Sequence, residues 1–249
     1  MTIFWNDHRK TRWAGAVLAG QAQVMIALLF FGVCEAHGAP VVQAEHNTTA
    51  TLQQLAFAEK VVAGAKLQLA RKVQHKETYE KIAYPLGDVN PKIGVCTDLV
   101  IRSFRKAGID LQQLVHEDRA AHPELYPTHL WKYKKPDKNI DHRRCQNLVV
   151  FFPRFAMTID KNDMGKWQPG DVVFFARQGR KYPWHVGIVS QSKGGARSSL
   201  TKSSLAKSSL TKSPLMIHSY PPRVKQDAVS NYGLIHSVFR WNKGATITR

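Results

Sequence analysis

The sequence predicts an α+β fold in which N-terminal helices pack on a C-terminal antiparallel sheet of about four to six strands. Apolar residues recur at helical spacing between residues 52 and 76. In the last third, short runs rich in Val, Ile and Phe alternate with turns that contain Gly and Pro. A chain of 249 residues, 43% of them hydrophobic, is sufficient for one packed core. We therefore expect a single main domain.

Residues 1–39 are typical of a secretory signal peptide. A basic segment, His8–Arg12, precedes a mostly apolar run from Ala14 to Val33, and small residues follow at Ala36 and Ala39. We expect cleavage after one of these two alanines, with no membrane span afterwards. A retained membrane anchor is the alternative, because the apolar run is long enough to span a bilayer. The predicted location is therefore the periplasm or the exterior of a bacterial cell.

The formal net charge of +18 and pI near 10 indicate a polyanionic partner. Removal of residues 1–39 takes away three basic and two acidic residues, so the remaining chain stays strongly cationic. An exported protein meets little nucleic acid, whereas the cell envelope is rich in anionic polymer. We therefore expect peptidoglycan or another anionic envelope polymer as the partner, and no nucleic acid.

The predicted boundaries are a polar linker over residues 40–51 and a single domain over residues 52–249. The domain is predicted to begin with an amphipathic helix over residues 52–76. A low-complexity insertion at 193–214 carries a five-residue repeat of Ser, Leu and Lys without acidic residues. The repeat is interpreted as a tolerated loop expansion, with contact to an anionic polymer as the alternative.

Cys96 is expected at the start of a second helix, which Gly108 ends, and Asp110 is placed to cap a third helix from Leu111. A thiol in the first turn of a helix meets the positive end of the helix dipole, which favours the thiolate. Two alternatives give Cys96 a structural role in place of a catalytic one. It is either a small buried apolar side chain or half of a disulfide with Cys145.

Two histidines are predicted on neighbouring strands of the sheet. The expected strands are Asp171–Ala176, His185–Ser190, Leu215–Ser219 and Leu234–Trp241. His185 opens the second strand and His218 lies near the end of the third, so antiparallel pairing brings the two side chains within reach. A helix packed on that sheet edge would bring Cys96 to them, and a cysteine nucleophile needs such a base and orienting group. The alternative is two hydrogen-bonded core histidines.

An irregular stretch over residues 120–144 ends in Asp141, His142, Arg143 and Arg144. Its residues are interpreted either as a recognition loop or as an internal ion-pair network that pins the loop. A metal site formed by His142 and Cys145 is only weakly indicated, because no second pair of ligands accompanies them. We therefore expect no metal and no cofactor.

Four motifs in order resemble those of the NlpC-type cell-wall peptidases, a papain-like superfamily. They are Gly94–Val100, Gln168–Phe175, His185–Val189 and Met216–Ser219. Within that superfamily, three further motifs make the chain most similar to a family of unknown function. These are Tyr84–Asp88, His116–Asp118 and Asn139–Arg144. The resemblance covers about residues 50–242.

The resemblance implies a papain-like fold with Cys96 as nucleophile, His185 as base and His218 as the orienting residue. It also implies that Tyr84 helps to bind the reacting carbonyl oxygen. The candidate substrate-binding residues are Asp98, Asp141, His142, Arg143 and Arg144. One departure is that Thr97 and Asp98 replace the usual Ser-Gly after the cysteine.

The expected function is that of an exported cysteine amidohydrolase or endopeptidase, which attacks amide bonds of peptidoglycan stem peptides or cross-links. Two alternatives stay open. The first is a non-catalytic cell-wall-binding protein, and the second is an acyltransferase or thioesterase of the same fold.

Overall fold

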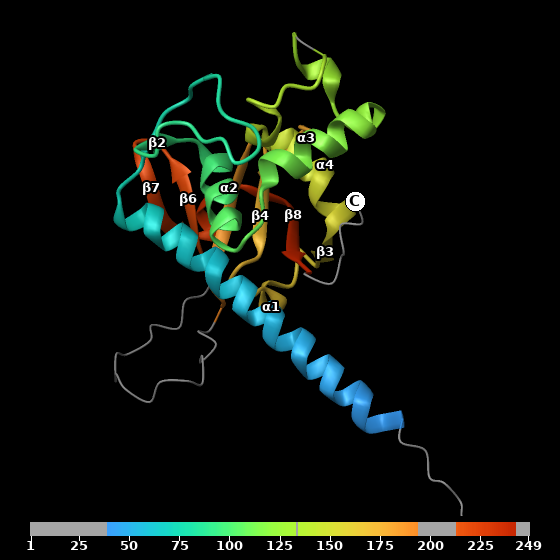
Figure 1. Cartoon of the computed structure of the whole chain (residues 1–249). Coiled ribbons are helices and arrows are strands. Elements are labelled where there is room, and N and C mark those ends of the chain that lie inside the picture. The colour runs from blue at the N-terminus through green and yellow to red at the C-terminus, as the bar shows by residue number, and fades with distance from the viewer. Residues whose placement is uncertain (1–38, 133, 194–212, 243–249) are drawn as a thin grey trace, which may run out of the picture. The chain divides into compact units, whose positions relative to one another are not determined.

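The computed structural model describes residues 39–132, 134–193 and 213–242 (Figure 1). The predicted signal peptide, except Ala39, and most of the insertion at 193–214 therefore lie outside the described residues. Within the described ranges, no helix has both the length and the apolar character that a membrane span requires.

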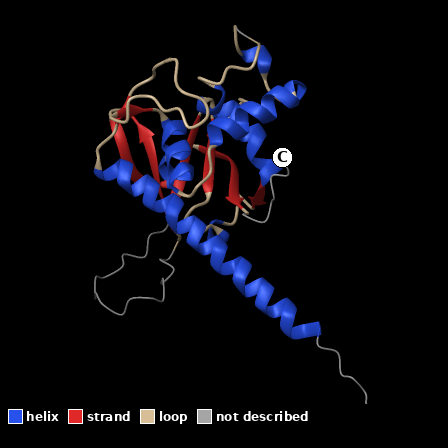
Figure 2. Cartoon of the chain, viewed as in Figure 1, coloured by secondary structure: helices blue, strands red, loops and turns tan. Residues whose placement is uncertain are grey.

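Four α-helices supply side chains to one apolar cluster. Figures 1 and 2 show these helices beside the sheet. They are α1 (Ala39–Ala70), α2 (Cys96–Lys106), α3 (Leu111–Ala121) and α4 (Cys145–Phe155). The starts of α2 and α3 agree with the prediction, and the Asp110 side chain accepts a hydrogen bond from the Gln112 N–H as a helix cap. Residues 40–51, expected to form a linker, are helical. The first helix ends before residue 76 because the chain enters a strand at Gln74.

The sheet has eight strands in the order β2-β1-β7-β6-β5-β4-β8-β3 within the described residues. They are β1 (Gln74–His75), β2 (Ile93–Gly94), β3 (Ala156–Ile159), β4 (Val172–Ala176), β5 (His185–Gln191), β6 (Leu215–Tyr220), β7 (Arg223–Ala228) and β8 (Leu234–Trp241). All neighbours pair antiparallel except β1 and β2, which are parallel.

The α+β prediction is confirmed, whereas the estimate of four to six strands is too low. The four predicted strands are β4, β5, β6 and β8. The additional strands lack the expected pattern, because β1 and β2 have two residues each and the sequence of β7, RVKQDA, is mostly polar. Short 3₁₀ helices occupy Pro123–Leu125, Thr128–Leu130, Asp141–Arg143, Met164–Lys166 and Val229–Asn231.

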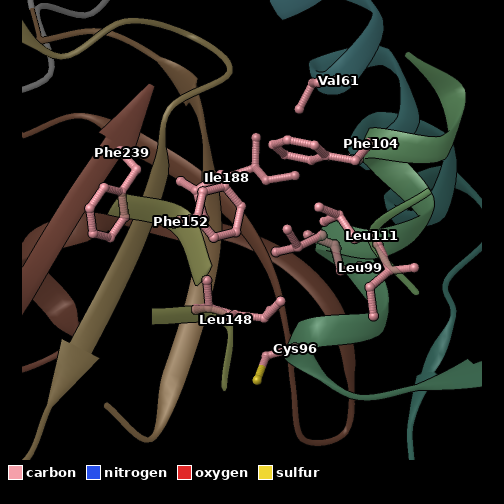
Figure 3. Close-up of a cluster of buried hydrophobic side chains, with 14 of the residues drawn as sticks. Val61, Cys96, Leu99, Phe104, Leu111, Leu148, Phe152, Ile188 and Phe239 are labelled. Carbon is pink, nitrogen blue, oxygen red and sulfur yellow. The ribbon is translucent and has the colours of Figure 1, made fainter. Parts of the chain in front are cut away.

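Both faces of the central strands are buried, which explains the unbroken apolar run in β4. Val172 and Phe174 belong to the helix-side cluster, while Val173 and Phe175 belong to a second cluster with Met216. Figure 3 shows part of the helix-side cluster, with Phe104 and Phe152 between the helices and the sheet and Cys96 at its border. The first residue of α2 therefore lies where the packed core ends.

Close helix packing and a short cap fix the position of α2. A Cβ atom at Gly64 of α1 would lie 2.7 Å from the Cα of Ser103, so only glycine permits this approach of α1 to α2. At the start of α2, Asp98 accepts a hydrogen bond of 2.7 Å from the Val95 N–H. These contacts hold the helix terminus that carries Cys96.

Candidate active site

Cys96, the first residue of α2, lies beside Cys145, the first residue of α4. Their Sγ atoms are 3.6 Å apart, and both thiols are free and buried. Together with His185, both cysteines line a cavity of about 680 Å³. Cys96 is 8% exposed. It lies at the border of the helix-side core and is also part of the cavity lining.

Three side chains on adjacent strands form a chain of hydrogen bonds behind the thiol. The His185 Nε2 is 2.7 Å from the His218 Nδ1, and the His218 Nε2 is 3.2 Å from an Asp227 carboxylate oxygen. The Tyr232 hydroxyl donates to the same oxygen at 2.6 Å. Gly187 leaves room for Met216 and His218, because a Cβ there would lie 2.9 Å from the Met216 Sδ and 3.2 Å from the Cβ of His218. We call His185, His218 and Asp227 the relay.

The protonation states of the relay follow from burial and charge. Burial, and then the neighbouring His185, lower the pKa of His218 to about 4, so this imidazole is neutral near pH 7. Burial opposes ionisation of Asp227, but hydrogen bonds from Tyr232 and His218 outweigh it and lower the pKa of Asp227. A neutral His218 that donates from Nε2 to this carboxylate must accept at Nδ1 from the His185 Nε2–H. The Nδ1 of His185 is then the basic nitrogen.

The two thiols have opposite pKa shifts. The hydrogen bond from Cys145, and then His185, lower the pKa of Cys96 well below its ordinary value despite the opposing effect of burial. The same sulfur contact, together with burial, raises the pKa of Cys145 well above its ordinary value. Cys96 is therefore the thiol that ionises first, which is the requirement for a cysteine nucleophile.

Comparison with known proteins identifies the family of this chain. A model described as "Domain of unknown function (DUF1287)" matches residues 62–241. The chain belongs to the DUF1287 family. It is 41% identical over 152 residues to "Uncharacterized protein YijF" of Escherichia coli (strain K12), in an alignment that covers 60% of this chain and 68% of the relative. The expected similarity to a family of unknown function is thereby confirmed.

The structure of this DUF1287 chain brings Cys96, His185 and His218 together, as expected, but leaves Tyr84 outside the cavity lining. The Tyr84 hydroxyl donates to Glu117 at 3.3 Å, and its ring packs edge-on against His116. Tyr84 therefore lies outside the cavity that Cys96 and His185 line, and this position does not support its expected part in binding the reacting oxygen. Its turn packs against α3, and not against the start of α2.

Three of the five predicted substrate-binding residues are engaged inside the protein. Arg143 forms a two-pronged ion pair with Asp98, with N–O distances of 2.7 and 3.0 Å, and also donates to the Thr78 carbonyl. Asp141 is fully buried and paired with Arg119 and His116. These contacts agree with the alternative of an internal ion-pair network for Asp98 and Asp141, while Arg143 takes part in that network and also lines the cavity.

The two remaining predicted residues differ from each other. His142 is buried, and burial followed by the charge of Arg143 lowers its pKa to about 3, so it is a neutral core side chain away from the cavity lining. Arg144 lines the cavity, and its guanidinium lies over the Trp131 ring with Cζ 3.9 Å from the ring centroid. Of the predicted recognition loop, Arg143 and Arg144 thus both line the cavity, and Arg143 is also paired with Asp98.

Several cavity residues escaped the sequence reasoning. They are Gln146, Arg177, Trp131, Trp184 and His75, together with Asp227 behind the cavity. Asp227 lies within β7, a mostly polar strand without a recognisable period, so nothing in the sequence indicated its proximity to His218. The sequence did contain a signal for Trp184, because it directly precedes His185. In the structure its ring stacks on that imidazole, with centroids 5.0 Å apart.

A metal centre is not built into the described part of the chain. No group of three or more His, Cys, Asp or Glu side chains there is arranged to hold an ion.

Proposed function

We propose that this protein is an exported cysteine amidohydrolase or endopeptidase that acts on amide bonds of peptidoglycan stem peptides or cross-links. One observation carries the proposal. A thiol with a lowered pKa sits at a helix terminus, beside a base whose tautomer is set by a second histidine and a carboxylate, in a cavity of substrate size.

The reaction begins with the Cys96 thiolate and a protonated His185. The sulfur attacks the amide carbonyl carbon, and the oxygen takes up the negative charge of the tetrahedral intermediate. The Cys96 backbone N–H, at the open end of α2, is a donor for this oxygen, and Gln146 replaces Tyr84 as the side-chain candidate. His185 then gives its proton to the leaving amine, and an acyl-thioester remains on Cys96.

Water completes the cycle. His185, now neutral, takes a proton from the water molecule as the oxygen attacks the thioester. The carboxylic acid product leaves and the Cys96 thiolate is restored beside the protonated base. His218 and Asp227 hold the imidazole in one orientation through both halves of the reaction and stabilise its positive charge.

The choice of peptidoglycan rests on the sequence. The four-motif resemblance to NlpC-type peptidases, the export signal expected over residues 1–39 and the net charge of +18 all favour an anionic wall polymer in an exported setting.

Release of soluble fragments from purified sacculi tests the proposal. Cys96→Ala and His185→Ala are expected to abolish release, while His122→Ala, a surface histidine outside the cavity, serves as the matched control. Release at the unmodified rate by Cys96→Ala refutes the mechanism. Sacculus binding by every variant without release by any of them supports the wall-binding alternative, and transfer of the acyl group to an added amine in place of water supports the acyltransferase alternative.

A further inference from the structure

Two arginine side chains, each packed on an indole ring, border the Cys96 cavity. Arg144 lies over Trp131, with its Cζ 3.9 Å from the ring centroid, and Arg177 lies over Trp184 at 5.0 Å. All four residues line the cavity. We call them the two Arg–Trp pairs.

The two guanidinium groups differ from most other arginines of the chain. The arginines with a carboxylate partner are Arg102, Arg105, Arg119, Arg143, Arg154 and Arg240. Within the described ranges, no ion pair joins Arg144 or Arg177 to a carboxylate. Arg144 lacks such a partner although it is half-buried, and the buried indole N–H of Trp131 has no hydrogen-bond partner in the described structure either. Arg177 is exposed, so the guanidinium donors of both pairs are open to an anionic ligand in the cavity.

Each Arg–Trp pair adjoins a different one of the two groups, the Cys96 thiol and the His185 imidazole. Arg144 directly precedes Cys145, whose sulfur contacts Cys96 at 3.6 Å, so this pair belongs to the thiol side. Trp184 directly precedes and stacks on His185, so the pair of Arg177 belongs to the imidazole side. In amide cleavage the thiol bonds to the acyl half, while the imidazole protonates the amine half.

We propose that Arg144 and Arg177 bind two carboxylates of one substrate, the first on the acyl half and the second on the amine half of the amide that is cut. The inference rests on the proposed function and narrows its substrate to amides with an anionic group on each side of the bond. A guanidinium matches a carboxylate with two parallel hydrogen bonds, and the indole beneath it fixes the plane of the fork.

The other charged side chains of the cavity wall do not neutralise Arg144 and Arg177 by an ion pair. Glu77 is the acidic side chain of the lining, and Arg143, also in the lining, is neutralised by Asp98. Arg144 and Arg177 are thus the guanidinium groups of the lining that form no ion pair within the described residues, although Asp141 and Asp137 act on Arg144 at longer range. A substrate with two negative charges gives the complementary pattern.

Calorimetric binding to the full-length Cys96→Ala protein tests the inference without turnover. The probes are a peptide amide with one carboxylate on each half, two versions in which one carboxylate is a carboxamide, and a neutral version with two carboxamides. Loss of either carboxylate is expected to weaken binding about 10- to 100-fold. Arg144→Gln should remove the preference for the acyl-half carboxylate alone, and Arg177→Gln the preference for the amine-half carboxylate alone.

Arg180→Gln is the matched control, because this exposed arginine lies in the same turn as Arg177 but outside the cavity lining. Equal binding of the dianionic and neutral probes overturns the inference, and so does an unchanged preference in Arg144→Gln and Arg177→Gln. A hydrolytically active Cys96→Ala protein would instead overturn the proposed function, so the two failures are distinguishable.

Discussion

Replacement of Asp227 by asparagine tests whether His185, His218 and Asp227 act together as a relay or are only buried polar side chains in contact. The substitution keeps the size of the side chain but removes its charge, and the new amide can present an N–H group to the His218 Nε2. His218 then no longer needs to carry its proton on Nε2, so its Nδ1 ceases to be a dedicated acceptor for His185. The base loses its fixed orientation and the stabilisation of its positive charge.

The expected loss follows from one hydrogen bond to a charged group. Such a bond contributes about 1.5–3 kcal/mol. The Asp227 side chain is 28% exposed, and its bond to His218 is long at 3.2 Å, so the low end applies. We expect kcat to fall about tenfold, since about 1.4 kcal/mol corresponds to a factor of ten in rate. KM should change little, because Asp227 lies behind the imidazoles.

The pH dependence of Cys96 alkylation provides the second readout. Asp227→Asn leaves the imidazolium of His185 less stable, so the thiolate loses part of its counter-charge and the pKa of Cys96 rises. The midpoint of the iodoacetamide reaction, followed on the peptide that contains Cys96, should therefore move to higher pH. Tyr232→Phe is the control, because it removes one hydrogen bond to Asp227 but keeps the charge. An unchanged midpoint together with an unchanged kcat in Asp227→Asn would refute the relay.

Three further predictions concern the surroundings of the thiol and the relay. Cys145→Ala removes the first cause of the lowered pKa of Cys96, so alkylation of Cys96 should require higher pH while the protein stays folded, and an unshifted midpoint would contradict this. Gly187→Ala places a Cβ 2.9 Å from the Met216 Sδ and 3.2 Å from the Cβ of His218, so both side chains must shift, and kcat should fall about tenfold with little change in far-UV circular dichroism. The pKa values of His142 and His218, about 3 and about 4, lie below their ordinary value of 6.5, so the unfolded chain binds protons first and stability is lost as pH falls from about 6.5. Urea unfolding at about pH 7 and pH 4.5 should show this loss, and His142→Met should flatten it.

Local sequence patterns predicted much of the fold and the positions of Cys96, His185 and His218 within it. The apolar spacing after Cys96 placed that residue at a helix start, and the alternating runs placed His185 and His218 on strands that are neighbours in the sheet. These features depend on residues close together in sequence, where periodicity and caps act directly.

Contacts between distant segments were not predictable in the same way. Asp98 and Arg143 are 45 residues apart, and Cys96 and Cys145 are 49 apart, yet both pairs meet where α2, the 3₁₀ turn and the start of α4 converge. Helix α4 itself lacked a clear signal because its apolar run contains Pro153. Without the position of α4, neither partner could be assigned.

The position of the relay along its strands bears on how the chain tolerates changes of length. β5 runs from His185 to Gln191 and β6 from Leu215 to Tyr220, so the segment that joins them leaves β5 at one end, while His185 opens β5 at the other. Register between paired strands, and not the length of their connection, sets the distance between the imidazoles. Within the described residues, the geometry of His185 and His218 therefore depends on the pairing of β5 with β6 and not on the length of the segment that joins them.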